Sequence, residues 1–254
     1  MGLANDIAST WVNEGELAIF WLGQAGFLLK DSSGRQLVID PYLSDYGERM
    51  RGFKRISPKL ISPSDLKPDY YLISHHHFDH LDYDSVPIIA SCKKTLFTAP
   101  ASCVEELRKM GIREEQYIEV EPGSRLLLGD IIVDVVDADH GTMAPDAIGY
   151  IVEMGGHRIY FSCDTSYRED IFSVVKELHP DIAVVCINGQ FGNMNAEEGA
   201  KAAAFVGADL AIPCHYWTFL EHCGCNPADF SKTMKKLDTD CKAVPMRHGE
   251  CLKV

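Results

Sequence analysis

A nine-residue stretch, SHHHFDHLD at residues 74–82, constrains the fold more than any other part of the chain. It holds four of the ten histidines and two aspartates, and it continues the apolar segment DYYLIS at residues 69–74. Imidazole and carboxylate groups are good ligands for zinc, manganese or iron, and functional loops are positioned by a rigid scaffold. The stretch therefore predicts a metal-binding loop at the end of a buried strand.

The spacing within this loop is H-x-H-x-D-H. His75 and His77 are two residues apart and can converge on one ion, while Asp79 and His80 can face a second. The alternative interpretation is a polar surface loop or a tag-like tract, although a tag would lie at a terminus and would lack the aspartates. Two metal ions that keep an open water position need about three further ligands from elsewhere in the chain.

Three further candidate ligands each follow a predicted strand. They are His140 in VVDADHG, Asp164 in IYFSCDTSY and His215 in AIPCHYWTF. A single histidine or aspartate after a strand is unremarkable. Three that each end an apolar strand indicate one rim at which strand ends meet.

Short apolar runs alternate with turn signals along the whole chain. They predict strands at residues 17–23, 26–30, 36–40, 69–74, 131–138, 148–154, 157–163, 181–187 and 210–214, with a hairpin turn at 31–35 and helices at 100–111, 168–179 and 195–207. The sequence contains no repeat, low-complexity tract or linker. We therefore expect one α/β domain over residues 1–254, with sheets inside and helices outside.

Charge and cysteine content narrow the class of protein. The chain has 37 acidic against 24 basic side chains and a formal net charge of -13, so we expect neither nucleic acid nor a membrane surface as a partner. No basic residue precedes Lys30, which argues against a secretory signal, and no apolar run reaches transmembrane length. Nine irregularly spaced cysteines are typical of reduced thiols, so a cytoplasmic protein is expected.

These motifs resemble those of the metallo-β-lactamase superfamily, which carries H-x-H-x-D-H, a later histidine, a GDT-like aspartate and a last histidine. The resemblance runs from WLGQAGFLL and LVIDPYL to IPCHYWTF, nearly the whole chain. Within the superfamily the chain is most similar to the L-ascorbate-6-phosphate lactonase group, on ERMRGFKRISPK (48–59) and NGQFGNMNAEEGAKAA (188–203). It departs from the pattern at Cys163, where glycine is usual, and at Trp217, where a smaller residue is usual.

The resemblance implies a four-layer αβ/βα sandwich with two divalent metal ions, manganese or zinc. The first ion would be held by His75, His77 and His140, and the second by Asp79, His80 and His215. Asp164 would bridge the two ions. A homo-oligomer is also expected from the lactonase group.

A hydroxide shared by two such ions could attack an electrophilic carbonyl at neutral pH. We assign catalytic roles to Asp79 and Asp164, and to Tyr216 as a donor to the developing oxyanion. Packing beside His215 is an equally good interpretation of Tyr216. The predicted reaction is the opening of a sugar lactone that carries a phosphate. A phosphodiesterase or amide hydrolase is the alternative, and a di-iron redox protein would need a carboxylate at His77.

Five basic residues in eleven positions, Arg49 to Lys59, stand out in so acidic a chain. A charge run is by default a solvated loop. Its place ahead of the metal loop, together with the lactonase resemblance, favours binding of the phosphate of a small anionic substrate. The residues assigned to that role are Arg49, Arg51, Lys54 and Arg55.

We interpret EHCGC (221–225) as a loop, and we expect His76 to point away from the metal ligands.

Overall fold

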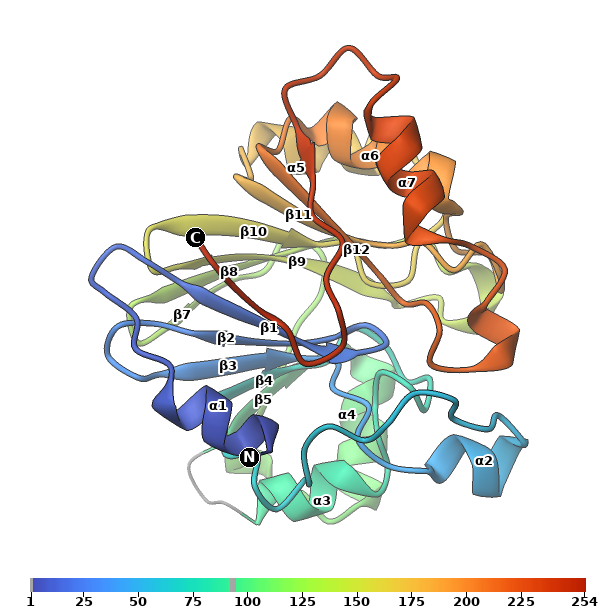
Figure 1. The fold of residues 1–254 in the computed structure, drawn as a ribbon. Coiled ribbons are helices and arrows are strands. Elements are labelled where there is room, and N and C mark those ends of the chain that lie inside the picture. The colour runs from blue at the N-terminus through green and yellow to red at the C-terminus, as the bar shows by residue number, and fades with distance from the viewer. Residues whose placement is uncertain (1, 92–94) are drawn as a thin grey trace. The chain divides into compact units, whose positions relative to one another are not determined.

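The structure is a computed structural model that describes residues 2–91 and 95–254. The chain divides into two compact units, Met1–Val120 with Arg247–Val254 (unit 1) and Glu121–Met246 (unit 2). Each unit contains one seven-stranded sheet with helices packed against it (Figure 1). The predicted α/β class is confirmed, and we describe the two units one at a time.

The sheet of unit 1 has the order β14-β1-β2-β3-β4-β5-β6. Its strands β14, β1, β2 and β3 are antiparallel, and β3, β4, β5 and β6 are parallel. The elements are α1 (Leu3–Ser9), β1 (Ala18–Gly23), β2 (Gly26–Lys30), β3 (Gln36–Ile39), α2 (Tyr46–Arg51), β4 (Tyr70–Leu72), α3 (Ser85–Ala90), β5 (Leu96–Ala99), α4 (Ala101–Lys109), η1 (Glu114–Gln116), β6 (Tyr117–Glu119) and β14 (Cys251–Lys253).

The core of unit 1 follows from the two-residue period of its strands. In β1, Ala18, Phe20 and Leu22 point to one face and join a cluster with apolar residues of α1, α3 and α4. The predicted hairpin turn between β2 and β3 forms because Asp31 Oδ1 accepts hydrogen bonds from the backbone N–H groups of Ser33 and Arg35, both at 2.9 Å. The turn fixes the register of β3, whose end leads to the site.

The sheet of unit 2 has the order β13-β12-β11-β10-β9-β8-β7. Its strands β7, β8, β9 and β10 are antiparallel, and β10, β11, β12 and β13 are parallel. The elements are β7 (Arg125–Leu128), β8 (Ile131–Asp137), η2 (Gly141–Met143), β9 (Ile148–Met154), β10 (His157–Phe161), α5 (Glu169–Glu177), β11 (Ile182–Cys186), α6 (Ala196–Val206), β12 (Leu210–Cys214), η3 (Leu220–His222), α7 (Pro227–Met234) and β13 (Lys242–Ala243).

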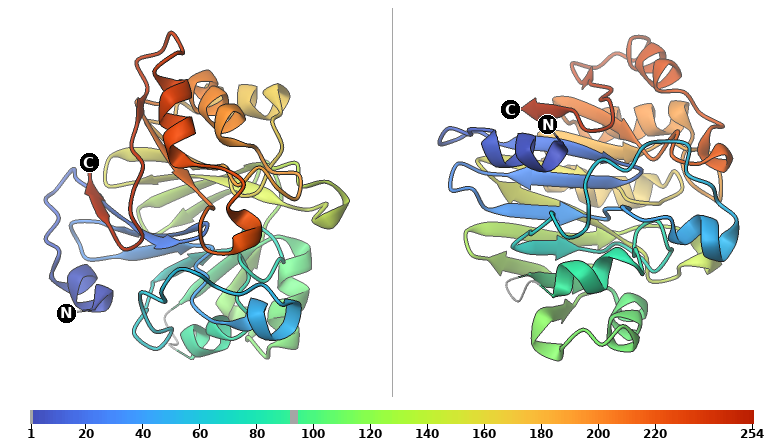
Figure 2. Two further views of the ribbon diagram at one scale, coloured as in Figure 1. Left: turned by 45° about the vertical axis from the view of Figure 1, so that its right-hand side comes forward. Right: turned by 60° about the horizontal axis from the view of Figure 1, so that its bottom comes forward.

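The helices α5, α6 and α7 lie against the sheet of unit 2 and against one another (Figure 1 and Figure 2). The predicted helix at 195–207 begins where expected, because Asn195 and Glu198 form a capping box. It ends at Gly207, whose φ of 80° suits glycine. Among the described residues, no helix has the length and apolar character needed to cross a membrane.

The directions of the strands in unit 2 place the loops after β8, β10 and β12 at one edge of the sheet. Because β8 is antiparallel to β9, and β9 is antiparallel to β10, the strands β8 and β10 run the same way. The parallel pairing of β10, β11 and β12 adds two more strands with that direction. The loops after β8, β10 and β12 therefore leave one edge of the sheet, and each carries a predicted ligand.

Candidate metal centre

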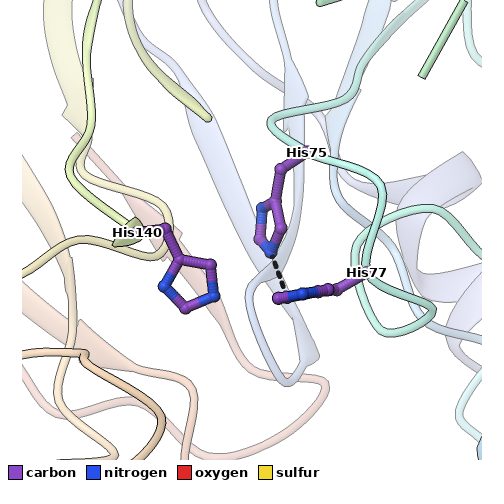
Figure 3. Close-up of side chains that lie close together, drawn as sticks. All are labelled: His75, His77 and His140. Carbon is purple, nitrogen blue, oxygen red and sulfur yellow. Dashed lines mark hydrogen bonds between the residues drawn. The ribbon is translucent and has the colours of Figure 1, made fainter. Parts of the chain in front are cut away.

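In unit 1 the loop that follows β4 carries four of the predicted ligands. His75 Nε2 and His77 Nδ1 lie 3.0 Å apart and are joined by a hydrogen bond (Figure 3). Asp79 Oδ2 lies 3.9 Å from His80 Nε2, and the His75 and His80 rings are 4.0 Å apart between centroids. His76 is directed to α4, where its Nδ1 lies 3.3 Å from Ser102 Oγ. The loop thus separates the four candidate ligands from the intervening histidine, as expected.

A buried carboxylate, Asp40, holds His80 from behind. It follows β3, and one of its oxygens lies 2.7 Å from His80 Nδ1 while the other accepts from the Ser74 backbone N–H at 2.8 Å. A carboxylate on one ring nitrogen fixes the tautomer and leaves the other nitrogen for a metal. Asp79 is held similarly, because Gln24 Nε2 donates to its Oδ2 at 2.7 Å. Sequence reasoning missed both residues, although Asp40 stands in the quoted segment LVIDPYL.

In unit 2 one carboxylate lies between two imidazoles. Asp164 follows β10, and its Oδ2 lies 3.7 Å from Nε2 of His140, which follows β8 (Figure 3 shows His140 on its loop). Its Oδ1 lies 3.2 Å from Nε2 of His215, which follows β12. Asn193 Nδ2 donates to Asp164 Oδ2 at 2.6 Å. All these side chains are buried, so the carboxylate is held in a fixed orientation between the two histidines.

Backbone strain accompanies the ligands in unit 2. Cys163 has a φ of 51°, His215 of 65° and Trp217 of 61°, all in the left-handed region that favours glycine. Strain of this kind collects at functional sites, where the surrounding structure enforces it. The left-handed conformation of Cys163 gives a physical reason for the glycine that the superfamily resemblance leads one to expect at this place.

Two aromatic neighbours of His215 complete the description of unit 2. The His222 ring stacks on the His215 ring at 4.8 Å between centroids and 25° between planes. EHCGC was interpreted as a loop, and the structure adds that its histidine is buried and ends the short helix η3. Burial raises the pKa of Tyr216, so this hydroxyl stays protonated and keeps a proton that it can donate in a hydrogen bond.

The candidate ligands in both units belong to groups of histidine and aspartate side chains that could hold a metal ion. They are His75, His77, Asp79, His80, His140, Asp164 and His215. Neutral imidazole and carboxylate are the donor types that zinc and manganese accept. The chemistry of the donor set therefore fits divalent metal ions.

The basic segment 49–59 is largely engaged with the protein itself. The Arg49 guanidinium makes two contacts with the Asp84 carboxylate, at 2.7 and 2.9 Å, and Lys59 pairs with Asp45. Arg55 Nη2 donates to the carbonyl oxygen of Tyr42 at 2.7 Å. Two of the four residues assigned to phosphate, Arg49 and Arg55, thus have structural partners.

The other two, Arg51 and Lys54, are exposed. Neither forms an ion pair among residues 2–91 and 95–254. Their role in binding a phosphate stays a prediction.

Two mixed sheets with packed helices, and an H-x-H-x-D-H loop that follows a parallel strand, define the metallo-β-lactamase fold. The chain belongs to the beta-lactamase superfamily domain family, whose model matches residues 35–216. The superfamily and the fold expected from the sequence are confirmed. The lactonase subgroup stays a prediction.

Named relatives agree with this assignment. A UPF0173 metal-dependent hydrolase of Archaeoglobus fulgidus is 32% identical over 249 residues, covering 92% of this chain and 97% of that protein. A second, from Methanosarcina mazei, is 30% identical over 250 residues, covering 94% and 99%. The solved structure of Igni18, a metallo hydrolase from Ignicoccus hospitalis, shares the fold with a TM-score of 0.74 at 21% identity, covering 94% and 98%. The chain is a metal-dependent hydrolase of this fold.

Proposed function

We propose that the chain is a dinuclear metal hydrolase that opens a lactone. The observation that carries the proposal is the position of Asp164, whose two oxygens each face a different imidazole, at 3.7 Å (His140) and 3.2 Å (His215). A carboxylate with one histidine beside each oxygen is suited to bridge two cations. The loop of unit 1 offers two further pairs of ligands, one pair for each ion. They are His75 with His77, and Asp79 with His80.

The family resemblance implies two ligand sets. His75, His77 and His140 would hold one ion, and Asp79, His80 and His215 would hold the other, with Asp164 shared. The contacts of Asp40, Gln24 and Asn193 support this assignment, because metal ligands are oriented by hydrogen bonds from behind.

When bound, two divalent ions would supply Lewis acidity and an activated water. The residues of the chain then have separate tasks. Asp79, fixed by Gln24, orients the attacking water, and Asp164 adds the negative charge that keeps two cations close. Tyr216, whose raised pKa keeps it protonated, donates to the oxyanion that forms as the carbonyl is attacked. Addition of water and cleavage of the ring ester bond give a hydroxy acid.

The metal part of the proposal is tested by elemental analysis of untagged protein. We expect about two divalent ions per chain after loading with manganese or zinc. His77→Ala should retain about one ion, whereas the control His76→Ala should retain both, because His76 is directed to Ser102 instead. Protein without stoichiometric metal, or a His76→Ala variant that loses as much as His77→Ala, would contradict the assignment.

The phosphate part of the proposal depends on the exposed cations Arg51 and Lys54. Charge-assisted hydrogen bonds contribute about 1.5–3 kcal/mol each, so losing one should lower kcat/KM for a phosphorylated sugar lactone roughly 10–100-fold. The matching neutral lactone should be unaffected. Arg51→Ala and Lys54→Ala are compared with Lys67→Ala, an exposed lysine of the same unit outside the basic segment.

The substrate panel should include phosphodiesters and amides beside the lactones. Equal behaviour of both lactones in all three variants would remove the phosphate from the proposal. Turnover of phosphodiesters or amides in place of lactones would favour the alternative hydrolase with the same metals.

A further inference from the structure

Large apolar side chains are exposed on the loops of unit 2 that carry the candidate ligands. Six large apolar residues of unit 2 are exposed in the described structure. Three of them, Met143, Trp217 and Leu220, lie on ligand loops, and a fourth, Phe191, lies on the β11–α6 loop that carries Asn193. Their exposed fractions are 43% for Met143, 45% for Phe191, 46% for Trp217 and 69% for Leu220. We call these four residues the apolar rim. Single exposed apolar residues are ordinary, but a group beside one site is not.

The apolar rim is continuous with the ligands in sequence and in space. Met143 lies three residues after His140, and Trp217 lies two residues after His215. The Phe191 ring meets the His222 ring edge-on at 5.5 Å, and that ring in turn stacks on His215 at 4.8 Å.

Two further contacts connect the members of the apolar rim with one another and with Tyr216. The Met143 methyl lies 4.0 Å from the point where a Cβ on Gly192, the neighbour of Phe191, would stand. The Trp217 ring lies 5.2 Å from the Tyr216 ring, edge to face. Three of the four rim residues thus lie next to the ligands or their neighbours, and Leu220 follows Trp217 by three residues in the chain.

Two members of the apolar rim are exposed to solvent and also have a strained backbone conformation. Phe191 has a φ of 56° and Trp217 of 61°, a conformation that bulky residues rarely adopt. A strained backbone that also exposes an aromatic ring is unfavourable twice over, in conformational energy and in apolar hydration. Such an arrangement persists where the surrounding structure and the function of the site require it.

We propose that the apolar rim binds an alkyl or aryl substituent of the substrate, next to the ligands of unit 2. This inference rests on the proposed lactone-opening function and names its substrate class, a lactone with an apolar substituent, which is the alternative to the phosphorylated sugar lactone at the same site. Four side chains are too few for a stable protein interface, which takes about 20–30 residues on each side. They suit one substituent, because small-molecule sites combine apolar walls with a few polar groups. The rim takes no part in bond making and acts only through binding.

The first test is a series of γ-lactones with lengthening alkyl chains, from γ-butyrolactone through γ-hexalactone to γ-octalactone. Burial of each methylene should raise kcat/KM by about fourfold in the wild type. Trp217→Ala and Phe191→Ala should flatten this dependence, which is read within each variant as the ratio of kcat/KM for γ-octalactone to that for γ-butyrolactone. Both variants keep the Cβ atom and remove a partly exposed ring, and thermal unfolding checks that they fold. Leu127→Ala is the control, because Leu127 is 72% exposed on the edge strand β7.

The second test does not depend on turnover. n-Octanoate, which resembles an apolar hydroxy acid product, is titrated into the metal-loaded protein and its binding is measured by isothermal titration calorimetry, which does not depend on Trp217 as a reporter. Acetate is the matched ligand without a chain. We expect octanoate to bind more tightly than acetate in the wild type and in Leu127→Ala, and equally weakly in Trp217→Ala.

The two tests separate this inference from the function on which it rests. Lactone turnover that is independent of chain length, or octanoate binding that Trp217→Ala leaves intact, would overturn the apolar rim. A wild type that hydrolyses no lactone but binds octanoate through Trp217 would overturn the lactone assignment and leave the rim standing.

Discussion

The two units supply their candidate ligands in different ways. Unit 1 takes His75, His77, Asp79 and His80 from one loop after β4, whereas unit 2 takes His140, Asp164 and His215 from three loops after β8, β10 and β12. In unit 1 the relative positions of the ligands are set by a few backbone angles. In unit 2 they are set by sheet register, for example the pairing of Cys186 in β11 with Cys214 in β12. Local sequence can specify the first set, and only the assembled sheet can specify the second.

The residues that hold the ligands differ as well. In unit 1 a charged group, Asp40, contacts His80 at 2.7 Å. In unit 2 the amide of Asn193 contacts Asp164 at 2.6 Å, and the ring of His222 stacks on His215. A buried carboxylate on an imidazole strengthens its basicity as well as fixing its orientation. Unit 1 should therefore be the more sensitive to loss of a supporting residue, and unit 2 to loss of the shared ligand itself.

The largest effect is expected from the shared ligand. Asp164→Asn should fold, since the amide has the same shape, but it lacks the negative charge that holds two cations together. Loss of a supporting residue at metal sites typically lowers affinity or activity 10–100-fold, so loss of a bridge should lower kcat by at least about 100-fold. Asp134→Asn, a surface carboxylate paired with Arg125 in the same unit, is the control for turnover and metal content. Turnover within about twofold of wild type would remove Asp164 from the site.

The long elements could be predicted from sequence because their patterns are local. The strands expected at 148–154 and 210–214 coincide with β9 and β12, and the helix at 195–207 is marked by its cap. Short elements such as α2 and α3 have no full period of apolar residues and could not be recognised. The partition into two compact units was not expected either, because no linker or change in composition marks it.

Contacts between residues that are distant in the sequence limit how much of the site could be predicted. The H-x-H-x-D-H loop was recognised from its own spacing. Asp40 is separated by 40 residues from His80, and nothing in either segment announces their contact. The basic segment was recognised from composition, but its acidic partners Asp45 and Asp84 become apparent only in the folded chain.

The next largest effect tests the difference between the two kinds of support. Asp40→Asn keeps the shape of the side chain and removes its charge, so metal affinity should fall about 10–100-fold. Asn193→Ala should lower affinity less, because a neutral hydrogen bond is weaker than a charge-assisted one. Competition with a chelator measures both, and thermal unfolding of the metal-free proteins checks that they fold. A larger loss for Asn193→Ala would reverse the proposed ranking of the two units.

A pair of glycine substitutions distinguishes general destabilisation from damage to the metal loop. A Cβ on Gly47 would stand 2.4 Å from Phe78 Cε2, and Phe78 lies between His77 and Asp79 in the ligand loop. A Cβ on Gly199 in unit 2 would stand 2.6 Å from Ile187 Cγ2. Overpacking of this kind lowers the free energy of unfolding by about 1–3 kcal/mol in either case.

Only Gly47→Ala should also weaken metal binding, because its clash displaces the ligand loop. Denaturant unfolding and chelator competition together measure the two effects. Equal metal affinity in both variants would show that Phe78 moves without its neighbours.

The smallest effect is expected at Arg49, for which the sequence and the structure suggest different roles. Hydrogen bonds from Arg49 hold the pKa of Asp84 below its usual range. The ion pair therefore stabilises the fold above the ordinary pKa of an aspartate and ceases to do so as the pH falls through the lowered value. Both side chains are partly exposed, so Arg49→Ala should cause only a small, salt-sensitive loss of stability that disappears in acid.

Turnover decides between the two roles of Arg49. Kinetics on the phosphorylated and the neutral lactone should be alike in Arg49→Ala, in contrast to the selective loss expected for Arg51→Ala. A selective loss for the phosphorylated lactone in Arg49→Ala would restore this residue to the substrate site. The pair with Asp84 would then be a resting contact that the substrate phosphate replaces.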